Sequence, residues 1–138
     1  MRGNIGRCLR SAAVCAALLA CAGPGWTADE EVPDVNPFSG DEKALREGRS
    51  WYRGVCASCH GGKADGAGER GTGADLRKLQ LGFKGFVHVV LDGRQVSGRT
   101  MAMPAWRGVL KNEDIYKIGA YLETLALEGA NWKEGVKR

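Results

Sequence analysis

The sequence predicts an all-α domain of three to four short helices. Three segments place their apolar residues three and four positions apart, the spacing that gathers side chains on one face of a helix. No segment alternates apolar and polar residues with a period of two for long enough to form a strand. The chain has 138 residues, and without an N-terminal targeting segment the remaining length is that of a single domain.

The three helices are expected over residues 41–55, 84–92 and 113–127. The first carries its apolar stripe on Ala44, Leu45, Gly48, Trp51, Tyr52 and Val55. The second is shorter and stops at Gly93, a residue suited to end a helix. In the third, Asn112 is the expected N-cap, and Glu113 and Asp114 suit the positive end of the helix dipole.

Cys56, Cys59 and His60 form the run C-A-S-C-H, which is the attachment signature of a c-type haem. On a helical turn, both sulfurs would project from one face toward the two vinyl groups of a porphyrin, with His60 as the proximal iron ligand. A thioredoxin-like pair would need a βαβ pattern here, and a zinc site would need a second C-x-x-C or a segment with two closely spaced histidines elsewhere in the chain. The sequence has neither, so we expect one covalent haem c.

The first 22 residues are typical of a secretory signal peptide. Three arginines precede an apolar stretch that is too short to span a bilayer. Ala20 and Ala22 form an A-x-A-like site, so we expect cleavage after Ala22, with Ala28 as the alternative. The mature protein would be periplasmic, and its two remaining cysteines, Cys56 and Cys59, would both hold haem.

A lipid anchor is the alternative outcome of processing. The run Leu18-Leu19-Ala20-Cys21 resembles a bacterial lipobox, which would leave Cys21 as a lipid-modified N-terminus, and we expect membrane contact only in that case.

The formal charge of +4 falls to +1 without the signal, because three of the twenty basic residues and none of the sixteen acidic ones lie there. Such a balance gives no basis for expecting nucleic-acid binding.

The mature chain is expected to divide into an extended N-terminal arm at 23–40, a domain at 41–127 and a C-terminal tail at 128–138. The arm is rich in proline, glycine and acidic residues and shows no helical or strand period. Residues 61–73, the glycine-rich loop, also lack an apolar period. We expect its glycines to let the backbone approach a flat ligand closely.

Met103 is the expected second axial ligand of the iron. It lies 43 residues after His60 in the segment G-R-T-M-A-M-P-A-W. A thioether is a soft, neutral ligand that stabilises ferrous over ferric haem. Pro104 fixes its own φ and restricts Met103. Met101 is the rival ligand, and simple core packing is the alternative role for both methionines.

With these residues in place, the chain resembles the class I c-type cytochromes from Asp41 to Leu125. The positions that match are Gly48, Tyr52, Cys56, Cys59, His60, Met103, Pro104 and Tyr121. The resemblance implies a class I cytochrome c-like domain around one haem, in which Gly48 lets the first helix cross the last. The residues expected opposite are Gly119, Ala120 and Tyr121. It also implies that residue 74 offers its carbonyl to the proximal imidazole; Ala74 replaces the family's proline there and fixes the carbonyl less firmly.

A narrower resemblance concerns the redox partners. Residues 74–79, 98–104, 108–110 and 120–124 look like those of small periplasmic cytochromes that take electrons from quinoprotein (PQQ) alcohol dehydrogenases. This implies a monomeric single-electron carrier, not an enzyme, that passes electrons to a respiratory terminal oxidase. The alternative is a haem enzyme or gas sensor with an open iron position. His88 is the one imidazole left to serve such a position, and its place opposite the apolar face of its helix predicts that it is exposed.

Overall fold

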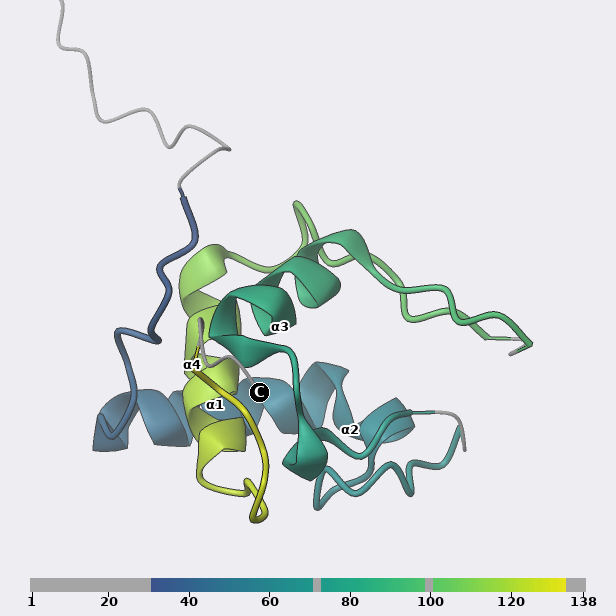
Figure 1. Ribbon diagram of the computed structural model, residues 1–138, viewed down its shortest axis with the longest axis horizontal. Coiled ribbons are helices and arrows are strands. Elements are labelled where there is room, and N and C mark those ends of the chain that lie inside the picture. The colour runs from purple at the N-terminus through teal and green to yellow at the C-terminus, as the bar shows by residue number, and fades with distance from the viewer. Residues whose placement is uncertain (1–30, 71–72, 99–100, 134–138) are drawn as a thin grey trace, which may run out of the picture. The chain divides into compact units, whose positions relative to one another are not determined.

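The computed structural model describes residues 31–70, 73–98 and 101–133, and the expected signal peptide with Cys21 lies outside them. The helical elements are α1 (Glu42–Val55), α2 (Ala57–His60), the 3-10 turn η1 (Leu76–Lys78), α3 (Gly82–Asp92) and α4 (Asn112–Glu123) (Figure 1). Within the described ranges the extended chain forms only isolated bridges and no strand, so the all-α prediction is confirmed. None of the described helices is both long and apolar enough to cross a membrane.

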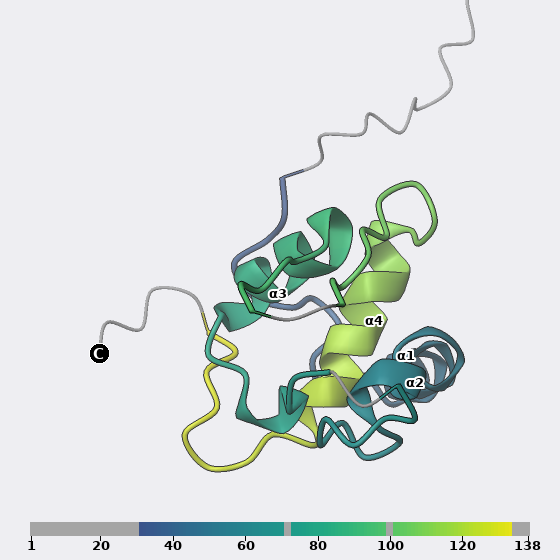
Figure 2. The same cartoon turned by 90° about the vertical axis from the view of Figure 1, so that its right-hand side faces the viewer.

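Helix α4 packs against both α1 and α3, and its crossing with α1 depends on Gly48 (Figures 1 and 2). A Cβ at Gly48 would collide with the backbone carbonyl of Lys117 and lie 3.0 Å from the nitrogen of Ile118. The predicted close crossing is therefore confirmed. Of the residues expected opposite, Tyr121 does lie against α1, with its ring centre 5.6 Å from that of Tyr52, but the atoms that a Cβ at Gly48 would meet belong to Lys117 and Ile118. Gly119 instead lies against the aromatic side chains of α3, where a Cβ would be 3.2 Å from the ring of Phe83.

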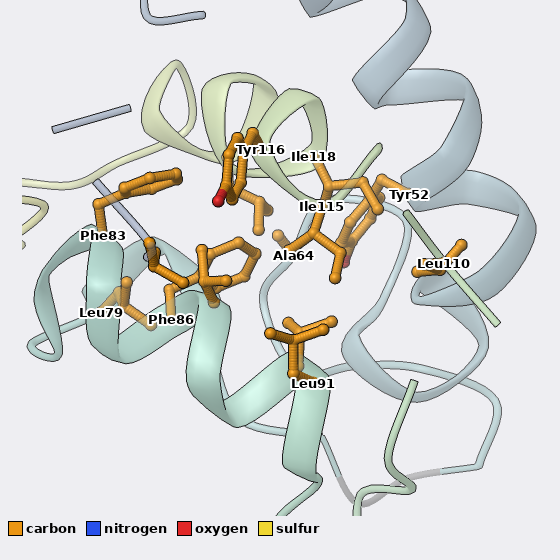
Figure 3. Packing of buried hydrophobic residues seen from close by; sticks show 14 residues of the cluster. Tyr52, Ala64, Leu79, Phe83, Phe86, Leu91, Leu110, Ile115, Tyr116 and Ile118 are labelled. Atoms are coloured by element: carbon orange, nitrogen blue, oxygen red, sulfur yellow. The ribbon is translucent and has the colours of Figure 1, made fainter. Parts of the chain in front are cut away.

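The core gathers apolar side chains from α1, α3 and α4, as Figure 3 shows. Its largest fully buried members are Tyr52, Phe83, Val87, Ile115, Ile118 and Leu122. The Tyr52 hydroxyl donates to the carbonyl of Gly61 at 2.6 Å and so ties α1 to the chain after α2. Burial raises the pKa of Tyr52, which keeps this hydroxyl protonated as a donor.

Lys117 forms an ion-pair cluster beside the helix crossing. Its Nζ lies 2.7 Å from the carboxylate of Glu47 and 2.6 Å from that of Glu113, and its side chain is 14% exposed. The ammonium also lies 5.7 Å from the centre of the Phe38 ring. The hydrogen bond from Lys117 lowers the pKa of Glu47. The cluster thus joins α1, α4 and the segment before α1.

The described part of the N-terminal arm, residues 31–40, lies on the domain. Val32 and Asn36 are buried. The Asn36 amide donates to the carbonyl of Tyr116 at 2.9 Å, and the Ser39 hydroxyl donates to the Glu123 carboxylate at 2.6 Å. These contacts hold the segment against α4.

The chain after α4 caps the start of α3. The N–H groups of Gly82 and Phe83 donate to the carbonyls of Asn131 and Trp132 at 3.1 and 3.0 Å. These bonds satisfy two of the donors that a helix leaves free at its N-terminus, and Leu81 at the N-cap offers no side-chain bond. The helix expected from residue 84 therefore begins at Gly82.

Both ends of α4 differ from the prediction. Lys111, in extended conformation and without a side-chain bond, is the N-cap, so the assignment of that role to Asn112 is wrong. The helix ends at Glu123, because the Thr124 hydroxyl donates to the Tyr121 carbonyl at 2.6 Å and the following N–H groups bond three residues back. The chain then turns to meet η1, where the Leu127 N–H donates to the carbonyl of Arg77 at 2.9 Å.

Candidate functional site

The C-x-x-C-H run forms a helical turn that almost continues α1. The N–H of Cys56 donates to the carbonyl of Tyr52 at 2.9 Å, and the N–H groups of Cys59 and His60 both donate to the carbonyl of Cys56. The two cysteines lie about one helical turn apart, and neither is in a disulfide. This is the local geometry on which the haem interpretation depends.

The environment of Cys56 disfavours redox exchange by its thiol. Burial, with Cys59 beside it, raises the pKa of the Cys56 thiol to about 12, so the thiol stays protonated at neutral pH. A thioredoxin-like pair needs a lowered pKa and a thiolate. Nor does the described part of the chain bring three or more His, Cys, Asp or Glu side chains together in a group that could hold a metal ion. Within the described residues, the pair therefore has the features of neither a zinc site nor a disulfide-exchange site.

The His60 imidazole is held in one tautomer by the backbone. Its Nδ1 lies 2.9 Å from the carbonyl oxygen of Ala74. A carbonyl can only accept, so Nδ1 carries the proton and Nε2 keeps a free lone pair that can bind iron. The sequence resemblance predicted this bond to Ala74, and the structure confirms it.

The glycine-rich loop returns against the turn that carries the cysteines. A Cβ at Gly68 would lie 2.5 Å from the carbonyl carbon of Cys59, and one at Gly73 would collide with the carbonyl oxygen of the same residue. The N–H of Gly73 donates to that oxygen at 3.1 Å. The close approach expected toward a flat ligand is thus made, in this structure, toward the chain's own backbone.

An ion pair beside Ala74 was not foreseen from the sequence. Asp75 caps η1, accepting from the backbone N–H of Arg77 at 3.1 Å and from its guanidinium at 2.9 Å through each carboxylate oxygen. These hydrogen bonds lower the pKa of Asp75 to about 2. The available signal was an aspartate at the start of a turn, directly after the segment that resembles the family's proximal loop.

Met103 is held by its backbone at the base of the loop after α3, seen in green at the right of Figure 1. Its N–H and carbonyl pair with those of Arg94, both at 2.9 Å. Gly93, with φ of 73°, allows this approach, because a Cβ there would lie 2.6 Å from the Met103 carbonyl. The pairing with Arg94 restricts the Met103 backbone further than Pro104 alone was expected to. No local sequence pattern predicts this pairing.

The two methionines differ in environment. Met103 is partly buried and packs against the hydrophobic core, whereas Met101 is 43% exposed. Packing and backbone pairing therefore both favour Met103 as the residue that presents a thioether at a fixed place. His88 is exposed, as predicted, and so does not face the interior.

Comparison with known proteins shows which family the chain belongs to. Residues 43–122 match the model of the family described as "Cytochrome C oxidase, cbb3-type, subunit III". A cytochrome c6 of Anabaena variabilis is 37% identical over 87 residues, which are 62% of this chain and 94% of the relative. The cbb3-type cytochrome c oxidase subunit CcoP of Azospirillum sp. (strain B510) is 31% identical over 97 residues. This match covers 68% of this chain but only 33% of that subunit.

A solved structure shares the fold. Cytochrome CL from the marine methylotrophic bacterium Methylophaga aminisulfidivorans MPT superposes with a TM-score of 0.54 at 23% identity, over 65% of this chain and 60% of that one. The family match, by contrast, extends over more than half of the chain and includes most of α1 and α4, the whole C-x-x-C-H turn and Met103. The chain therefore belongs to the cytochrome c family, and the family model that it matches is the one described as subunit III of the cbb3-type oxidases.

Proposed function

We propose that this cytochrome is a periplasmic single-electron carrier with one covalently attached haem c ligated by His60 and Met103. Cys56 and Cys59 would hold the macrocycle through thioethers. The observation that carries the proposal is the bond from His60 Nδ1 to the backbone, because it leaves Nε2 free to bind iron. Haem supplies a one-electron couple, and filled axial positions allow electrons to pass without a substrate bond at iron.

Nothing in the described residues favours the alternative of a haem enzyme or gas sensor with an open iron position. Such a site needs a distal polar group, and His88 is exposed. Met103, in contrast, is restrained at both of its backbone polar groups. A visible spectrum of the ferric protein tests this step, since six-coordinate low-spin haem and five-coordinate high-spin haem absorb differently. A high-spin spectrum would contradict Met103 ligation.

We further propose that the electron donor is a quinoprotein (PQQ) alcohol dehydrogenase and the acceptor a respiratory oxidase. The donor is supported by the short sequence segments that resemble such dehydrogenase partners. The acceptor is supported by the match to an oxidase subunit. Docking would occur over the haem edge near Ala57, Ser58, Met101 and Ala102; the last three are exposed and carry no charge that would oppose a partner.

Stopped-flow mixing with alcohol and the dehydrogenase tests the partner. We expect reduction to be fast, and Ala102→Glu to slow it by roughly two- to tenfold without changing the visible spectrum, because a charge at an interface mainly alters the association rate. Ala126→Glu places the same charge on an exposed alanine beyond α4 and serves as the control. Reduction no faster than that of an unrelated cytochrome would remove the partner proposal while leaving the electron carrier intact.

A further inference from the structure

The backbone at residues 73–76 must keep the Ala74 carbonyl in one orientation. The His60 imidazole donates from Nδ1 to the Ala74 oxygen at 2.9 Å. In the family that this segment resembles, a proline stands at the same position and limits the chain by fixing φ. Ala74 is exposed and follows Gly73, so neither side chain restricts the backbone here. The restriction must come from another feature.

Two backbone hydrogen bonds flank the peptide between Ala74 and Asp75. The Gly73 N–H donates to the Cys59 carbonyl at 3.1 Å, and the Leu76 N–H donates to a carbonyl of the glycine-rich loop at 2.8 Å. They fix the chain on either side. The direction of the Ala74 carbonyl, however, depends on ψ of Ala74 and φ of Asp75, the torsions that flank its planar peptide. A contact that fixes Asp75 therefore also fixes this carbonyl.

The Asp75 carboxylate is held through both oxygens. Oδ1 accepts from the backbone N–H and Nε of Arg77 at 3.1 and 2.9 Å, and Oδ2 accepts from Nη2 at 2.9 Å. The exposed fractions of the two side chains are 22% and 30%, so water competes less than it does for open surface pairs. The Arg77 carbonyl in turn accepts from the Leu127 N–H at 2.9 Å. The pair is thus anchored to the chain that follows α4.

We propose that Asp75 and Arg77 are positioning residues that aim the Ala74 carbonyl at the His60 imidazole, in place of the proline of the family. This rests on the proposed function, in which Nε2 of His60 binds iron. A persistent hydrogen bond at Nδ1 keeps the ring in one tautomer and orientation. It also makes Nε2 a stronger electron donor to the iron. Weakening the pair should therefore speed exchange of the Nδ1 proton and raise the midpoint potential, because a weaker donor stabilises ferric iron less.

The test uses Arg77→Lys, which keeps the positive charge but cannot form the two parallel bonds to the carboxylate. In the reduced holoprotein, we expect the His60 Nδ1 proton to exchange about five- to tenfold faster by NMR, the factor that corresponds to a loss of about 1 kcal/mol at a partly exposed pair. The midpoint potential should rise in the same variant. When Ala74→Pro is introduced first, φ of residue 74 is fixed and the ring narrows the range of its ψ, so Arg77→Lys should change both quantities less than it does without the proline.

A matched control is Arg107→Lys, because Arg107 pairs with Asp92 through Nη2 at 2.6 Å elsewhere on the surface. This variant should leave the His60 proton unaffected. Unchanged exchange in Arg77→Lys would overturn the proposal, and so would an equal acceleration with and without Ala74→Pro. The spectrum of the unmutated holoprotein tests the proposed function first: if His60 does not ligate the haem, both proposals fail before any variant is compared.

Discussion

Gly48→Ala should destabilise the holoprotein by about 2 kcal/mol, because a methyl group at this position has no space. The new Cβ would overlap the carbonyl of Lys117 and lie 3.0 Å from the nitrogen of Ile118. All of these are backbone atoms of α4, so no side-chain rotation relieves the overlap and the two helices must move apart.

The magnitude follows from two opposing terms. Overpacking of a close contact costs about 1–3 kcal/mol, and a backbone-to-backbone clash belongs at the upper end of that range. Alanine returns about 1 kcal/mol through its higher helix propensity. The net loss of about 2 kcal/mol corresponds to a fall in Tm of roughly 10 °C for a domain of this size.

Gly54→Ala is the matched control in the same helix. Gly54 is exposed, and a Cβ there would have nothing within 4 Å. Only the propensity term applies, so this variant should be stabilised by up to about 1 kcal/mol. Urea unfolding followed by far-ultraviolet circular dichroism measures both changes. Equal shifts in the two variants, or no loss for Gly48→Ala, would refute the close crossing as the cause.

Three further predictions concern the haem ligand, haem attachment and acid stability. Met103→Ala should leave haem attached but lower the midpoint potential and open iron to added ligands, whereas Met101→Ala should do neither; redox titration decides, and exchanged behaviour would reassign the ligand. Cys59→Ser should yield little holoprotein, because so small a domain needs haem in its core; a cooperative thermal transition of native size in haem-free protein would contradict this. Lys117 lowers the pKa of Glu47 below 4.5, so the stability from this pair is present above that pH and lost as the pH falls through the lowered value. Glu47→Gln should flatten that acid dependence in urea unfolding between about pH 3 and pH 6, and an unchanged profile would mean that the pair does not contribute.

Local patterns were enough to predict the main helices and the motif that names the family. The stripe of α1 follows from residues three and four apart. The structure adds that Asp41, the first residue of the expected range, is the N-cap, because its carboxylate accepts from the N–H of Ala44 at 2.8 Å. The Gly48 crossing and the bond from His60 to Ala74 came from the family resemblance. The Gly48 crossing depends on glycine, because any residue with a Cβ would clash with the backbone of α4.

Contacts between distant parts of the chain could not be predicted from local patterns. The start of α3 is set by Asn131 and Trp132, some fifty residues downstream, so no window around residue 84 reveals it. The residues opposite Gly48 depend on how α4 is rotated about its axis, a choice made by packing against Phe83. Met103 is placed by pairing with Arg94, which has no sequence signature of its own.

The burial of Cys56 implies an order of events in maturation. In the folded chain, this cysteine packs against the core, and its thiol has a pKa of about 12 instead of the ordinary 9, so it is a poor nucleophile. In a chain that has not yet folded, the same thiol is accessible and more reactive. Attachment of haem should therefore precede the docking of α4, which comes more than fifty residues later in the sequence. Folding then encloses a bond that has already been made.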